Sequence, residues 1–184
     1  MKKLILFSLV AFCGMTYGQK FIVTSDGLRD ANDLEKTFVV LNLEGKTAKQ
    51  LYDNAIKYIN KNYKNPDASI KGKIDGEYLK FNSYKPELLF ILNGGVKKVF
   101  FDANYTTEMS FKDGKVKYEI IELNMHQINN VSIPLTFIGS GLNWYVFNKK
   151  GELKRAETKQ DIESYFNSEI KIILLSLKGT NDNW

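Results

Sequence analysis

The stretch TEMSFKDGKVKYEI, residues 107–120, decides the fold because it specifies an antiparallel hairpin together with its register. Asp113 and Gly114 form a pair that is typical of a two-residue turn between strands. With this pair at the turn, the larger side chains of the two strands share one face: Phe111 with Val116, Met109 with Tyr118, and Thr107 with Ile120. A slip of one residue would move them all to the opposite face, so the register is well specified.

A strand and a helix are predicted before this hairpin. Residues 38–43, FVVLNL, form an apolar run that ends at Gly45. Thr47 and Gln50 then make the Thr-x-x-Gln pattern of a capping box, which predicts the start of a helix. The apolar residues of this helix recur every three or four positions, which indicates one buried face: Ala48, Leu51, Tyr52, Ala55, Ile59 and Tyr63.

The rest of the chain predicts a meander followed by a second long helix. Asp75-Gly76 marks another hairpin, and residues 142–148 form an aromatic-rich strand. Thr158-x-x-Asp161 is the predicted cap of the last helix. Helices kept apart from an antiparallel sheet indicate an α+β fold, with two helices packed on one face. We expect a single domain over residues 19–178 and a polar tail over 179–184.

The first eighteen residues have the pattern of a secretory signal peptide. Lys2 and Lys3 precede an apolar run over residues 4–12, and small residues follow. This pattern predicts cleavage between Gly18 and Gln19.

A lipoprotein acylated at Cys13 is the competing interpretation, but the bulky Phe12 beside it fits that processing poorly. Cleavage would remove Cys13, the only cysteine, and leave a chain without disulfides. We expect an exported protein, periplasmic or extracellular.

Charge and hydropathy argue against two further classes of protein, those that bind nucleic acids and those that span a membrane. Of the 26 basic residues only Arg29 and Arg155 are arginine, and the net charge is +5. Dispersed lysine is a poor basis for a nucleic-acid site, so no nucleic-acid partner is predicted. No later stretch reaches the ~18 apolar residues of a membrane span, so the mature chain has no predicted transmembrane segment.

Two of these stretches resemble a known family. Residues 38–64 resemble its strand followed by a helix with the pattern K-x-x-x-L-Y, and residues 110–118 resemble its later hairpin. The family is that of domain of unknown function 4468, found in secreted bacterial proteins. The resemblance covers about residues 36–125 and implies a fold like that of the TATA-box-binding protein. Its motifs are structural and imply no site residues, and residues 131–151 lie outside it.

No group of residues predicts catalysis, a metal or a cofactor. His126 is the only histidine, and we interpret it as structural. Ser140 lies between glycines but lacks the Gly-x-Ser-x-Gly elbow, so we expect a turn there. Three aspartates, Asp26, Asp30 and Asp33, are interpreted as a solvated acidic segment, because the glycine of a calcium loop is missing.

The run Leu88–Leu92, LLFIL, followed by Asn93-Gly94-Gly95, is the strongest signal for a ligand site. Five consecutive apolar residues favour a strand buried on both faces. The alternative is an apolar flap, over a groove or against lipid, hinged by the glycines. The hypothetical groove is lined by Leu89, Phe90, Tyr105 and Trp144.

We therefore expect an exported cell-envelope protein that acts as a non-catalytic binding or interaction module. Its partner would be a protein or an apolar small molecule of the envelope. A carrier or sensor of an apolar ligand is the alternative, with a helix closing over a curved sheet. A hydrolase that uses carboxylates is a remote third possibility.

Overall fold

The computed structural model describes residues 19–128 and 130–179. The predicted signal peptide, residues 1–18 including Gly18, lies outside the described residues, as does the tail beyond residue 179. In chain order the elements are β1 (Phe21–Thr24), β2 (Gly27–Asp30), β3 (Phe38–Asn42), α1 (Ala48–Asn62), α2 (Pro66–Ser69), β4 (Ile70–Ile74), β5 (Tyr78–Asn93), β6 (Lys97–Lys112), β7 (Lys115–Gln127), β8 (Asn130–Gly139), β9 (Trp144–Asn148) and α3 (Ala156–Lys178).

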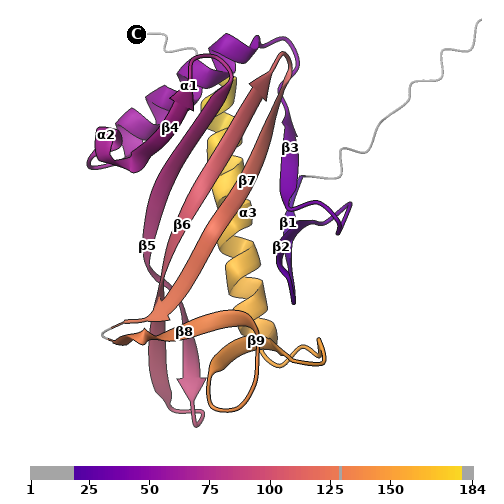
Figure 1. Ribbon diagram of the computed structural model, residues 1–184, viewed down its shortest axis with the longest axis vertical. Coiled ribbons are helices and arrows are strands. Elements are labelled where there is room, and N and C mark those ends of the chain that lie inside the picture. The colour runs from indigo at the N-terminus through magenta and orange to yellow at the C-terminus, as the bar shows by residue number, and fades with distance from the viewer. Residues whose placement is uncertain (1–18, 129, 180–184) are drawn as a thin grey trace, which may run out of the picture.

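A seven-stranded sheet forms one layer of the molecule (Figure 1). Its strands run in the order β4-β5-β6-β7-β8-β9, and β3 pairs with the opposite end of β7. All pairings are antiparallel except that of β8 with β9. The α+β prediction is confirmed. No helix in the described part of the chain is long and apolar enough to span a membrane.

The long helices cover one face of this sheet, and strand β6 shows how. Every second side chain of β6 is buried on that face: Val99, Phe101, Ala103, Tyr105, Thr107, Met109 and Phe111. From α1, the ring of Tyr52 meets Phe111 edge-on at 5.6 Å, and from α3, Phe166 meets Tyr105 edge-on at 5.2 Å. The two-layer arrangement follows from this single alternating strand.

The predicted hairpin register is confirmed. Phe111 pairs with Val116, Met109 with Tyr118 and Thr107 with Ile120. The predicted helix is confirmed too, because the side chain of Thr47 accepts from the backbone N–H of Gln50 and the Gln50 side chain accepts from the Thr47 N–H.

The predicted cap of the last helix is wrong. Helix α3 begins at Ala156, with Arg155 at the N-cap and no side-chain cap, whereas Thr158 is buried inside the first turn. The Arg155 guanidinium donates to the carbonyl of Tyr145 and lies 5.3 Å from the Trp144 ring, measured to the ring centroid. Tertiary packing against β9 therefore decides where this helix starts.

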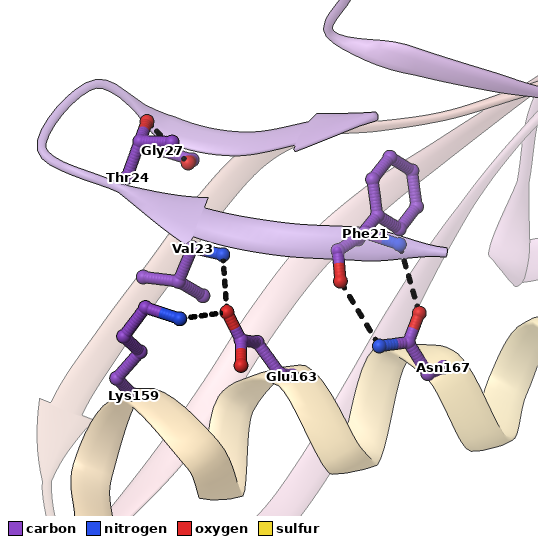
Figure 2. Close-up of polar contacts among 7 residues, drawn as sticks. All are labelled: Phe21, Val23, Thr24, Gly27, Lys159, Glu163 and Asn167. Atoms are coloured by element: carbon purple, nitrogen blue, oxygen red, sulfur yellow. Dashed lines mark hydrogen bonds and ion pairs between the residues drawn. The ribbon is translucent and has the colours of Figure 1, made fainter. Parts of the chain in front are cut away.

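A small hairpin, β1–β2, lies outside the main sheet and packs on α3 (Figure 2). The Asn167 amide accepts from the Phe21 N–H at 2.8 Å and donates to the Phe21 carbonyl at 3.0 Å. Two residues further along β1, the Val23 N–H donates to the Glu163 carboxylate at 2.8 Å. These α3 side chains take the place of a neighbouring strand at the outer edge of β1.

Two irregularities interrupt the long strands at the same level of the sheet. The β5–β6 register shifts between Lys85 and Leu89, and the β6–β7 register shifts between Asn104 and Thr106. The Asp102 carboxylate accepts from the Glu87 N–H at 2.8 Å and from the Tyr84 hydroxyl, so it holds the first bulge in place. Beyond Phe101, the last residue of β6 that pairs with β7, strands β5 and β6 continue as a narrow hairpin.

The run Leu88–Leu92 lies in this narrow hairpin, and the expectation that it is buried on both faces is wrong. Leu89 and Ile91 are buried, whereas Phe90 and Leu92 are 40% and 46% exposed. A two-stranded extension with packing on one side only cannot cover both faces.

Candidate functional site

A cleft opens at the edge of β5, at the point where β4 ends. The pairing of β4 with β5 stops at Phe81, so the next residues of β5 have a free edge. Helix α2, the end of α1 and the flank of α3 surround this edge. The cleft has a volume of about 530 Å³, within the usual range for ligand sites. Its lining residues are Tyr58, Asn62, Tyr63, Lys64, Asn65, Ala68, Ser69, Lys71, Asn82, Ser83, Tyr84, Asn104, Tyr105, Tyr165 and Glu169.

The lining of this tyrosine cleft combines aromatic rings with many hydrogen-bonding groups. Every side chain in it except that of Ala68 carries a hydrogen-bonding group. Five are tyrosines and four are asparagines, and both types can donate and accept. The cleft can therefore satisfy a ligand that has donors and acceptors close together.

Hydrogen bonds and ring contacts hold the tyrosines in place. The hydroxyls of Tyr105 and Tyr165 lie 2.7 Å apart, and the hydroxyl of Tyr63 lies 2.6 Å from that of Ser83. The Tyr63 ring also meets Phe81 edge-on at 5.7 Å. Burial raises the pKa of Tyr63 and of Tyr165 to about 12, so both hydroxyls stay protonated at neutral pH. The cleft wall is thus built before any ligand arrives.

Glu169 is the one carboxylate in the lining. It projects from α3, one turn after Tyr165, and is half-buried. Burial raises its pKa above the ordinary value of 4.5, and the positive charge of Lys85 offsets only part of this effect. A desolvated carboxylate beside a cleft gains free energy when a ligand donates to it, so Glu169 is the strongest candidate for a binding group.

Comparison with known proteins identifies the fold. No family model matches the chain, and no curated protein sequence matches it. A solved structure does match, the crystal structure of a DUF4468 family protein from Bacteroides ovatus ATCC 8483. The TM-score is 0.52 at 16% identity, over 80% of this chain and 90% of that one. The fold is DUF4468-like.

This DUF4468-like fold confirms the resemblance inferred from residues 38–64 and 110–118, and the match extends well beyond residues 36–125. At 16% identity the likeness concerns the fold alone. The function has to be argued from the site itself.

The four residues of the hypothetical groove are not brought together. Leu89 and Phe90 are neighbours on a strand and point to opposite faces. Tyr105 lies in the tyrosine cleft, packed on α3. Trp144 lies on β9, where its ring meets Phe101 edge-on at 5.8 Å. Gln19, the predicted first residue of the mature chain, lines a separate groove between β1 and α3.

The remaining candidates are scattered. His126 is half-buried on β7 opposite Pro134, and Ser140 is exposed just after β8. Asp30 ends β2, and Asp33 makes an ion pair with Lys36 at 2.9 Å. Within residues 19–128 and 130–179, no three His, Cys, Asp or Glu side chains form a metal-binding group.

Sequence reasoning missed Glu169 and its tyrosine neighbours. Tyr165 belongs to the apolar stripe of the last helix, and Glu169 follows it by one helical turn. An acidic residue beside the apolar stripe of a helix was the available signal. What could not be read from the sequence is that α1 and β5 bring Tyr58, Tyr63 and Ser83 to the same place.

Proposed function

We propose that this protein is an exported, non-catalytic binding module and that the tyrosine cleft is its ligand site. The single observation that carries this is Glu169, a half-buried carboxylate with a raised pKa in a cleft of about 530 Å³. Export, to the periplasm or beyond, rests on the signal-peptide pattern of residues 1–18.

The chemistry of the lining favours a polyhydroxylated ligand of sugar size. Lys64 and Lys71 only donate, ionised Glu169 only accepts, and the tyrosine and asparagine groups do both. A simple amine would satisfy Glu169 and make no use of the remaining hydrogen-bonding groups of the lining. Neighbouring hydroxyls of a sugar can both donate and accept, and the C–H face of the sugar ring packs on aromatic rings.

The same lining gives less support to the two alternatives. A carrier of an apolar ligand needs walls without polar groups, whereas here every lining side chain except Ala68 also presents a hydrogen-bonding group. A glycoside hydrolase that uses carboxylates needs two of them on either side of the scissile bond. Glu169 is the sole acidic side chain in the described lining, so the site favours binding over hydrolysis.

The first test is native mass spectrometry of the naturally processed protein, purified without detergent. We expect a bound mass in the range of a mono- or oligosaccharide, and a lipid-sized increment would move the assignment to the apolar carrier.

The second test is a titration of a panel of soluble di- and oligosaccharides, followed by saturation-transfer difference NMR. Glu169→Gln should weaken binding about tenfold or more, since hydrogen bonds to a charged group are worth about 1.5–3 kcal/mol. Glu157→Gln, an exposed position in the first turn of α3, is the matched control and should bind as wild type. If no sugar in the panel shows saturation transfer, or if both variants bind equally, the assignment of the cleft is wrong.

A further inference from the structure

The β5–β6 hairpin protrudes from the end of the sheet that lies farthest from α1 (Figure 1). The last residue of β6 paired with β7 at this end is Phe101, opposite Gln127. Beyond it, in the part of the chain that the structure describes, strand pairing continues between β5 and β6 alone, from Phe90 with Phe100 to Asn93 with Lys97. We call residues 88–101 the hairpin tip.

One face of the hairpin tip is apolar and exposed. Phe90 and Phe100 lie directly opposite each other with ring centroids 5.9 Å apart, and they are 40% and 37% exposed. Leu92 continues this face at 46% exposure, and Val96 in the turn is 88% exposed. An exposed strand face is normally polar, so a contiguous apolar face marks an interaction surface.

This face is not needed to build the core. The opposite face of the same hairpin supplies the buried side chains, including Leu89 and Phe101. The ring of Trp144 packs on Phe101 from that side. The outward apolar side chains of the hairpin tip are therefore surplus to folding.

The charge of the hairpin tip points to the kind of partner. Residues 88–101 contain Lys97 and Lys98 and no acidic residue. The Lys98 ammonium lies 4.3 Å from the centroid of the Phe90 ring, so the positive charge lies next to the exposed aromatic surface. Aromatic and aliphatic side chains beside lysine match the interface of an anionic bilayer, where the rings enter the acyl boundary and the ammonium groups meet phosphate.

We infer that the hairpin tip docks on an anionic lipid surface, with Phe90, Leu92 and Phe100 entering the headgroup region. The connection between β8 and β9, residues 140–143, reaches the same end of the molecule (Figure 1) and carries the fully exposed Leu142. Both segments could thus touch one flat surface at the same time.

A bilayer explains this face better than a second copy of the chain does. In a symmetric dimer the same patch meets itself, which would bring Lys97 and Lys98 of each copy close to those of the other. Like charges facing each other across an interface oppose association. Anionic headgroups remove that repulsion.

The test is flotation of the naturally processed protein with vesicles of phosphatidylglycerol and phosphatidylcholine, compared with phosphatidylcholine alone. We expect binding to the anionic vesicles only. Lys97→Gln with Lys98→Gln should weaken binding on the order of thirtyfold, from about 1 kcal/mol per basic residue. Phe90→Ser with Phe100→Ser should reduce binding at least tenfold, because both rings leave the interface.

The matched control is Ile172→Ser with Leu175→Ser, which removes two exposed apolar side chains from α3, 46% and 66% exposed. This variant should bind vesicles as wild type, and thermal unfolding should show all variants folded. Equal vesicle binding by the Phe90/Phe100 variant and wild type would overturn the inference. A second result would also overturn it: the wild-type protein sediments as a dimer and does not bind vesicles, and the Phe90/Phe100 variant sediments as a monomer.

Discussion

Replacing Asn167 by alanine should destabilise the protein by about 2–3 kcal/mol. The Asn167 amide donates to the Phe21 carbonyl and accepts from the Phe21 N–H, so it closes the outer edge of β1 (Figure 2). Each hydrogen bond contributes about 1 kcal/mol net. Phe21 is fully buried, so its two backbone groups would lose their partners in a place that water reaches poorly.

Urea denaturation measures this change directly, and a loss of 2 kcal/mol corresponds to a fall in Tm of about 4–8 °C at this chain length. Ser168→Ala, at the next and exposed position of α3, is the control and should stay within about 0.5 kcal/mol of wild type. Asn167→Asp keeps the acceptor and loses the donor, so it should also destabilise. The reasoning is refuted if Asn167→Ala unfolds like wild type and hydrogen exchange at the Phe21 amide is unchanged.

Three further changes test other parts of the structure. Thr47→Ala removes the α1 cap and should cost about 1 kcal/mol in urea denaturation. Gly139→Ala would place a Cβ 2.8 Å from the Cβ of Tyr145 and should lower stability by about 1–3 kcal/mol in thermal unfolding, whereas Gly72→Ala, with no atom closer than 3.8 Å, should be nearly neutral. Because the pKa of Glu169 is raised on folding, wild-type stability should fall as pH rises from about 4.5 through that raised pKa. Glu169→Gln should abolish this part of the pH dependence, and identical pH profiles would contradict it.

Local patterns were enough to predict the elements whose signals are local. The Asp113-Gly114 turn carries its own register, because a slip would expose every large side chain of the hairpin. The capping box at Thr47 likewise needs only residues 47–50. In both cases the chemistry that selects the structure lies within a few residues.

Signals that depend on distant partners were misread. Thr158 has the sequence of a cap, yet α3 starts earlier because Arg155 packs on Trp144 of β9. The parallel pairing of β8 with β9 and the strand β2 leave no comparable local signature. The cleft has no local signature for the same reason, since its walls come from six separate elements.

The tyrosine cleft and the hairpin tip should also respond independently to mutation. On β5 and β6 the described cleft lining includes Tyr84 and Asn104, whereas the exposed apolar face begins at Phe90 and Phe100. The bulge fixed by Asp102 separates the two surfaces. We therefore expect no shared contacts and no coupling between them.

Measuring both activities on both variants tests this independence. Glu169→Gln should weaken sugar binding and leave vesicle flotation unchanged, and Phe90→Ser with Phe100→Ser should do the reverse. If the hairpin variant lost sugar binding as well while still unfolding at the wild-type temperature, the two surfaces would be coupled through the bulge. In that case the Asp102→Asn variant, which weakens the acceptor for Tyr84 and for the Glu87 N–H, should reduce the coupling. Separate losses would instead show that one sheet carries two independent binding surfaces, on either side of a single irregularity in its strands.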